Sequence, residues 1–174
     1  DYLSCPVTAE QVERAIQEEP EKPFALYLTS PDYLGNQLDL DAIGAVCQRC
    51  GVPLLVDNAH GAYLKFLPQS RHPMDFGAAL CCDSAHKTLP VLTGGAYLHF
   101  RQEAMRQRVK DAMALFGSTS PSYLILQSLD RANPYLETLP QGLLALAPNI
   151  AALKGSLLAR GFTLAGDELL KLTI

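Results

Sequence analysis

The sequence predicts an α/β fold in which helices wrap a β-sheet, and three observations lead to this prediction. Two short apolar runs, Val52 to Val56 and Ala78 to Cys82, are bounded by turn residues. Apolar runs of this length are typical of strands buried in a parallel sheet. Segments with the apolar spacing of amphipathic helices alternate with such runs along the chain, and this order favours a sheet wrapped by helices.

The first elements follow from capping and turn signals. Thr8 is followed three positions later by Gln11, as in a helix capping box, and Gly51 is placed to end a later helix. The expected order is a helix from Thr8 to about Pro20, a strand over 24–28, and a helix from Asp39 or Asp41 to Gly51.

The second half of the chain is predicted to be mainly helical after one further strand. Ser120 and Pro121 fit the cap and first turn of a helix that Asn133-Pro134 should end. The expected elements are a strand over 96–100, helices over 102–116, 120–132 and 135–160 (the last interrupted by Pro140, Gly142 and Pro148), and a strand pair beginning within 162–174.

Length and composition limit the classes of protein. The 174 residues are expected to form about one domain. The net charge of −4 and the absence of a basic block argue against nucleic acid or an anionic membrane as a partner. No apolar run approaches the ~20 residues of a membrane span, and no secretory leader opens the chain.

Cysteine usage indicates the compartment. The five cysteines suit a reducing environment, so a cytoplasmic location is expected. Cys47 and Cys50 have CxxC spacing, but they fall within a predicted helix and no second ligand pair follows, so no metal site is expected.

Chemically capable side chains follow both apolar runs. Asp57 and His60 come after the first run, and Ser84, His86 and Lys87 come after the second. Sites in open α/β sheets form at the carboxyl ends of strands, so these residues are expected at one edge. A lysine for a Schiff base and an acid against a pyridine nitrogen are the pair that pyridoxal phosphate needs. Simpler roles compete: Lys87 as a solvated loop residue, Asp57 as a helix cap, and the histidines as packed or surface rings.

Four stretches, in matching order over roughly residues 20–133, resemble the ornithine/lysine/arginine decarboxylase family. Residues 84–90 (Ser-Ala-His-Lys-Thr-Leu-Pro) resemble its cofactor-attachment motif, and residues 57–62 (Asp-Asn-Ala-His-Gly-Ala) resemble its Asp-x-Ala-His-Gly segment. The stretches 29–35 and 118–130 agree as well. The resemblance implies a three-layer α/β fold, that of the large domain of fold type I pyridoxal-phosphate enzymes, the aspartate aminotransferase type.

The resemblance also implies a role for each site residue. Pyridoxal 5'-phosphate would form its Schiff base with Lys87, and Asp57 would pair with the protonated ring nitrogen. Ala59 would pack on one face of the ring, while Ser84 and His86 would bind the phosphate.

The role of His60 stays open between two alternatives: it orients the substrate carboxylate as a catalytic residue beside Lys87 and Asp57, or it packs beneath the turn. Gly94-Gly95 stands where the family usually has a glutamine, and this departure leaves the substrate open.

The implied activity is decarboxylation of lysine, arginine or ornithine to the corresponding polyamine-type amine and carbon dioxide, by a homodimer of the full-length protein. An aminotransferase, another lyase on the same fold, or a catalytically silent fragment stay as alternatives. Residues 1–134 would be the central part of the large domain, and residues 135–174 would supply linking helices and the start of a small domain.

Overall fold

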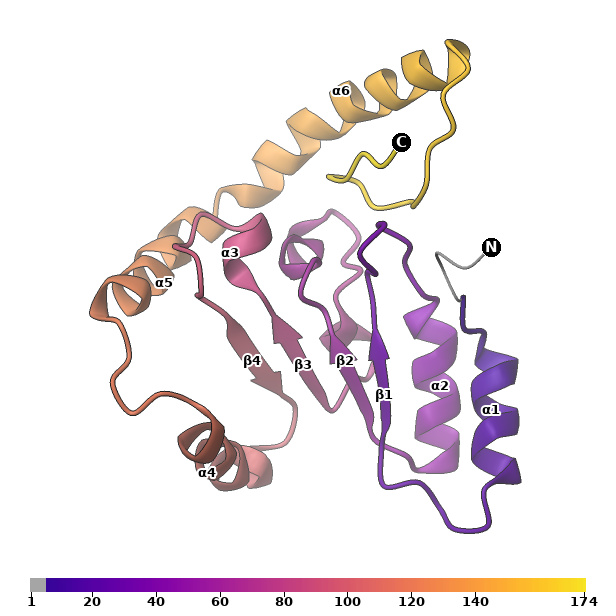
Figure 1. Ribbon diagram of the computed structural model, residues 1–174, viewed down its shortest axis with the longest axis vertical. Helices are drawn as coiled ribbons and strands as arrows, with labels where there is room; N and C mark the ends of the chain where they lie inside the picture. Colours follow the sequence, from indigo (N-terminus) through magenta and orange to yellow (C-terminus); the bar gives the residue numbers. More distant parts are fainter. Residues whose placement is uncertain (1–5) are drawn as a thin grey trace.

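The computed structural model describes residues 6–174, which form a four-stranded mixed sheet in the order β1-β2-β3-β4 (Figure 1). The strands are β1 (Leu26–Thr29), β2 (Leu54–Asp57), β3 (Leu80–Asp83) and β4 (Tyr97–Phe100). β1, β2 and β3 are parallel, whereas β4 runs antiparallel to β3. The predicted α/β class is confirmed, and the strand pairing places the ends of β2 and β3 side by side.

Two helices pack against the parallel strands, as predicted. α1 (Ala9–Glu18) begins with the capping box of Thr8 and Gln11. In α2 (Leu40–Cys50), Asp39 is the cap residue, and Gly51 ends the helix with a φ of 64° in the left-handed region. The buried core between these helices and the strands contains Val12, Leu40, Ile43, Val46, Cys47, Leu54, Val56 and Ala78.

A second core cluster lies around the short helical segments that follow β2 and β3. The segments in this cluster are η1 (Ala62–Phe66) and α3 (Ala85–Thr88), whereas Met74 and Phe76 of η2 (Pro73–Phe76) pack against the first cluster. The buried members of the cluster are Ala62, Tyr63, Leu64, Ala85, Leu89 and Leu143. Because α3 and η1 share this cluster, the packing holds the helix that carries His86 and Lys87 against the segment that follows the 57–60 turn.

The long helices of the second half differ in detail from the prediction. They are α4 (Arg106–Phe116, preceded by η3, Glu103–Met105), α5 (Tyr123–Leu136) and α6 (Leu139–Ala159). Ser122, and not Ser120, caps α5, since its side chain accepts a hydrogen bond from the backbone N–H of Ile125. Pro134 and Pro148 lie inside α5 and α6 and do not end them. Pro140 lies in the first turn of α6, where the missing N–H needs no partner.

The expectation that no apolar run approaches the length of a membrane span is wrong, because one helix is long enough and apolar enough to cross a membrane by length and composition. α6 has 21 residues, with a mean hydropathy of 1.4 over its 18-residue window, of which 6% is buried. Among the described residues it is the single helix with these properties. Figure 1 shows α6 extending past the edge of the sheet, so its apolar side chains have little cover from this chain.

After α6 the chain folds back towards the loop that follows β1 (Figure 1). The predicted strand pair in this segment is reduced to one isolated antiparallel bridge between Ala165 and Thr173. We refer to residues 161–174 as the C-terminal segment.

Candidate active site

The predicted site residues lie at the carboxyl ends of β2 and β3. Asp57 is the last residue of β2, and it is paired in register with Cys82 of β3. Ser84 follows β3 directly, and α3 then carries Lys87. Because the two strands are parallel neighbours, their ends open at the same edge of the sheet, as expected from the apolar runs.

Lys87 lies against His60. Its Nζ is 3.2 Å from Nε2 of His60, and the Lys87 side chain is exposed. Burial, followed by the positive charges of Lys87 and Lys171, lowers the pKa of His60, against the opposing effect of Asp57 and Asp32. A neutral His60 has a lone pair at one ring nitrogen, and a protonated lysine can only donate, so Nε2 is the acceptor in this contact.

Asp57 is held by the turn that it begins. Its Oδ1 accepts a 3.0 Å hydrogen bond from the backbone N–H of Ala59, and its Oδ2 lies 3.4 Å from the hydroxyl of Tyr27. The residue is half-buried and so is Ala59. The carboxylate therefore has a defined orientation and retains acceptor capacity for a cationic partner.

Ser84 and His86 precede Lys87 and carry different polar groups. Ser84 occupies the cap position of α3, but its hydroxyl makes no capping hydrogen bond to that helix. Nδ1 of His86 lies 3.0 Å from the carbonyl oxygen of Gly95 and must donate to it. The Nε2 of His86 is then left for a second partner, and it donates to an anion when the ring is protonated.

The structure explains why glycines occupy positions 94 and 95. Gly94 has a φ of 98°, a conformation that side chains disfavour. A Cβ on Gly95 would lie 2.3 Å from Cγ1 of Val91. The carbonyl of Gly95 also accepts from the backbone N–H of His86 at 3.2 Å, so this close turn fixes the position of the His86 ring.

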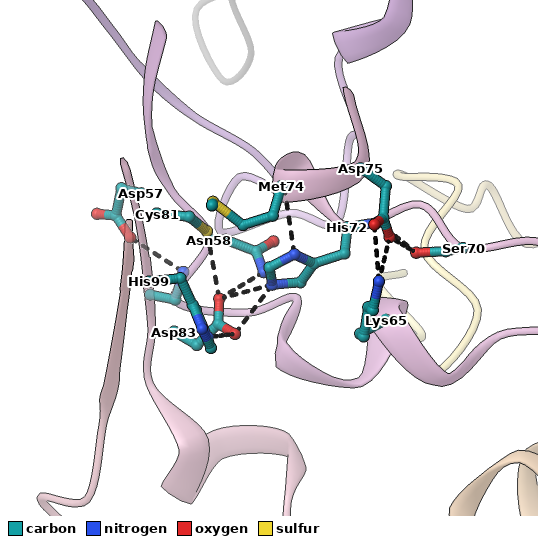
Figure 2. Close-up of polar contacts among 11 residues, drawn as sticks. Asp57, Asn58, Lys65, Ser70, His72, Met74, Asp75, Cys81, Asp83 and His99 are labelled. Atoms are coloured by element: carbon teal, nitrogen blue, oxygen red, sulfur yellow. Dashed lines mark hydrogen bonds and ion pairs between the residues drawn. The ribbon is translucent and has the colours of Figure 1, made fainter. Parts of the chain in front are cut away.

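A buried carboxylate that the sequence-based interpretation missed lies next to the site. Figure 2 shows the Asp83 carboxylate enclosed by His72, His99 and Asn58. Its Oδ2 is 3.0 Å from Nε2 of His72 and 2.9 Å from Nε2 of His99, and its Oδ1 accepts from Nδ2 of Asn58 at 2.7 Å. Burial opposes ionisation here, but the hydrogen bonds from His72 and His99 outweigh it and hold the pKa of Asp83 well below its usual range. Its position in the sequence could have indicated it, because Asp83 ends an apolar run and directly precedes Ser84.

The same three side chains have the composition of a metal site, since the ligand-type atoms of His72, Asp83 and His99 lie within 4.8 Å of one another. However, the backbone N–H of Met74 donates to Nδ1 of His72 at 3.3 Å. A neutral ring that accepts at Nδ1 carries its proton at Nε2, where a metal would need the lone pair. We therefore interpret the cluster as a hydrogen-bond network in which His72 donates a hydrogen bond to Asp83, and not as a metal site.

This network joins the two loops of the site. Asn58 follows Asp57, and Asp83 precedes Ser84, so the 2.7 Å bond between them ties the end of β2 to the end of β3. The backbone N–H of Asn58 also donates to the carbonyl of Cys82 at 2.9 Å. Such a connection fixes the spacing between the two loops without using any group that faces the site.

The donor set fits pyridoxal phosphate. The cofactor has an aldehyde, a pyridine nitrogen and a phosphate. These parts require, in turn, an amine, a carboxylate and a hydrogen-bond donor, and the site offers an exposed amine, a half-buried carboxylate at the end of β2 and a hydroxyl that does not cap α3. Lys87, Asp57 and Ser84 would hold these three parts. The fold, a mixed sheet covered by helices, is that of the large domain of fold type I pyridoxal-phosphate enzymes, and this is the class that the fold defines.

Comparison with solved structures agrees with this fold. The chain superposes on serine palmitoyltransferase of Sphingomonas wittichii with a TM-score of 0.72 and 17% identity, over 93% of this chain and 42% of that one. It superposes on mouse CSAD with a TM-score of 0.63 and 24% identity, over 96% of this chain and 40% of that one.

Sequence comparison then gives the family. The model of the Orn/Lys/Arg decarboxylase major domain matches residues 3–145, and the chain belongs to this family. It is 36% identical over 140 residues to an arginine decarboxylase of Halalkalibacterium halodurans, over 78% of this chain and 28% of the relative. It is 38% identical over 129 residues to the uncharacterized protein YaaO of Bacillus subtilis, over 72% of this chain. The chain spans 27% to 30% of the length of the curated relatives that it matches.

Proposed function

We propose that this chain forms the cofactor-binding core of a pyridoxal-phosphate-dependent decarboxylase, which in the complete protein acts on lysine, arginine or ornithine. One observation carries the proposal: in a member of the Orn/Lys/Arg decarboxylase family, Asp57 ends β2, Lys87 lies on the helix that follows the adjacent strand β3, and His60 contacts Lys87. The names of the relatives favour arginine among the basic amino acids.

Lys87 is the residue we propose for covalent attachment of the cofactor. An amine must lose its proton before it attacks a carbonyl, and the unperturbed pKa of a lysine is about 10.4. The neutral imidazole of His60, 3.2 Å away, is placed to accept that proton. When bound, the cofactor supplies an electron sink for the electrons released as the carboxylate leaves.

Asp57 is the residue we propose to hold the pyridine nitrogen protonated. An ionised carboxylate favours the charged form of a neighbouring base, and this effect strengthens as water is excluded. The hydrogen bond from the Ala59 N–H points Oδ1 along the turn. Ala59 itself is small enough to let an aromatic ring approach the same turn.

Ser84 and His86 are proposed to bind the phosphate. The Ser84 hydroxyl, which makes no capping hydrogen bond, and Nε2 of His86 belong to residues on either side of Ala85, just before Lys87 in the chain. Because Nδ1 of His86 already donates to the carbonyl of Gly95, Nε2 is the ring nitrogen left to face the phosphate.

Borohydride reduction of the complete protein with pyridoxal phosphate tests the cofactor assignment. Peptide mapping should find the reduced label on Lys87, and a label on another lysine would contradict it. Incubation with each of the three basic amino acids then tests the reaction, with carbon dioxide and the amine as expected products. An aminotransferase would instead yield a keto acid without carbon dioxide, and this alternative shares the same lysine and aspartate.

We also propose that the complete protein is a cytoplasmic homodimer. Several helices expose large apolar side chains, among them Phe116 on α4, Leu124 on α5 and Leu144 on α6. Apolar patches of this kind are typical of protein interfaces, and closed two-fold dimers are the commonest oligomers. Sedimentation of the active protein tests this proposal, since an active monomer would refute it.

A further inference from the structure

The C-terminal segment packs on the loop that follows β1, far from it in the sequence. The backbone N–H groups of Asp167 and Glu168 donate to the carbonyl of Gly35 at 2.9 Å and 3.0 Å. The hydroxyl of Thr173 donates to the carbonyl of Leu34 at 2.9 Å. These bonds bring the end of the described chain against residues 33–35.

The contact is close enough to require glycine. Gly166 has a φ of 76°, and a Cβ there would lie 2.5 Å from the carbonyl oxygen of Leu34. The backbone of the segment therefore lies directly against the loop that follows β1.

Lys171 of this segment reaches the site through Tyr33. Its Nζ lies 4.8 Å from the centroid of the Tyr33 ring, a cation–π distance, and donates to the backbone carbonyl of the same residue. Tyr33 is 80% exposed, so core packing does not hold it in place. Lys171 contacts both its ring and its backbone.

Tyr33 in turn contacts His60. The two rings meet edge to face, with centroids 5.7 Å apart and an interplanar angle of 90°. His60 then contacts Nζ of Lys87 at 3.2 Å. A continuous series of contacts thus runs from Lys171 through Tyr33 and His60 to the proposed cofactor lysine.

We infer that Lys171 is a positioning residue of the site: through Tyr33 it holds the His60 ring against Lys87 and keeps that ring neutral. The inference rests on the proposed function, because it assigns a role in preparing Lys87. Both parts of the role have a physical basis. A ring pinned at its edge loses rotational freedom, and a nearby cation disfavours the imidazolium form.

The charges that face His60 come from several elements. Lys87 of α3 and Lys171 of the C-terminal segment disfavour its protonation, whereas Asp57 of β2 and Asp32 of the loop after β1 favour it. Tyr33 contributes a ring edge without charge. Removal of Lys171 should therefore raise the pKa of His60, because the two carboxylates would face one cation fewer.

Lys154 provides a matched control. Its Nζ donates to the backbone carbonyl of Glu168 at 2.6 Å, so it also anchors the C-terminal segment. No contact of Lys154 with Tyr33 or His60 occurs in the described residues. A purely structural role for Lys171 predicts that the two lysines have the same effect.

The test uses the complete protein without cofactor. The rate of carbethoxylation of His60, followed by peptide mass spectrometry across pH, reports the titration of this imidazole alone, since the neutral ring reacts. Lys171→Met should raise the pKa of His60 and slow the reaction near pH 6, whereas Lys171→Arg should behave as wild type. Lys154→Met, which removes a different anchor of the segment, should leave the titration unchanged.

A kinetic test separates the ring contact from the charge. Tyr33→Leu should lower kcat about tenfold with little change in KM, because His60 is no longer aligned with Lys87, whereas Tyr33→Phe should retain activity. An unchanged His60 titration in Lys171→Met, or an equal shift in Lys154→Met, would overturn the inference. Failure of the proposed function would instead appear as absent borohydride labelling of Lys87, with the carbethoxylation results unaffected.

Discussion

Nδ2 of Asn58 donates a 2.7 Å hydrogen bond to Oδ1 of Asp83, and this bond joins the loops that carry the proposed cofactor residues. Both residues are buried. The carboxylate of Asp83 also accepts hydrogen bonds from Nε2 of His72 and Nε2 of His99, so it is the centre of this buried network.

Asp83→Asn should therefore destabilise the fold. The substitution removes the charge of a carboxylate that faces four donors, and loss of one partner of a buried charged network costs about 3 kcal/mol. Urea denaturation at pH 7 measures the effect. Asp111→Asn on the exposed surface of α4 is the control and should change the free energy of unfolding by less than about 0.5 kcal/mol.

The same pair of proteins should show a defined pH dependence. The pKa of Asp83 is lowered in the folded state, so its stabilisation is present above the unfolded carboxyl pKa of about 3.9 and is lost as pH falls through the folded value. The difference in stability between wild type and Asp83→Asn should shrink as the pH falls below about 4. A difference that stays constant from pH 7 to pH 3 would contradict this assignment.

Lys87→Ala should abolish covalent attachment of the cofactor in the complete protein. Catalysis should fall by several orders of magnitude because the covalent route is lost. Borohydride labelling and carbon dioxide release measure the two effects. Lys110→Ala, on the exposed surface of α4, should leave both unchanged.

Asp57→Asn should separate the effect of the side chain's shape from the effect of its negative charge. Asparagine retains the acceptor for the Ala59 N–H, so the turn and cofactor binding should persist. Without the negative charge the pyridine nitrogen is not held protonated, and kcat should fall about a hundredfold. An active Asp57→Asn enzyme would show that another group fulfils this role.

Ser84→Ala should weaken cofactor binding while the fold is retained. The hydroxyl does not cap α3, so its removal should leave the helix unaffected. A hydrogen bond to a charged group contributes about 1.5–3 kcal/mol, which corresponds to a loss of about tenfold or more in affinity. Fluorescence titration with pyridoxal phosphate measures this loss, and Ser156→Ala on α6 is the control.

Gly95→Ala should disturb the site through the backbone. Its Cβ would meet Val91 and displace the carbonyl that orients His86, and overpacking of this kind costs about 1–3 kcal/mol. Gly142→Ala on α6 is the opposite case, since no described atom beyond the adjacent residues and the backbone of its own helix lies within 4 Å of the added Cβ. There alanine should stabilise the helix by about 0.5–1 kcal/mol, as thermal unfolding of the two variants can show.

The sequence was sufficient to predict the elements that depend on local signals. The caps at Thr8 and Asp39 and the stop at Gly51 satisfy backbone groups within a few residues, so they are visible in the order of residue types. The strands ending at Asp57 and Asp83 were predicted to within a few residues from their apolar runs. Proline signals were less decisive, because α5 and α6 continue through Pro134 and Pro148.

The sequence by itself also determined which residues follow the two central strands, and hence the candidates Asp57, Ser84, His86 and Lys87. Only the tertiary structure decided what these residues contact. The series from Lys171 through Tyr33 to His60, and the burial of Asp83 between His72 and His99, join residues from separate elements. No local pattern encodes such contacts, because they arise when packing of the whole chain brings distant segments together and a buried charge must find its donors there.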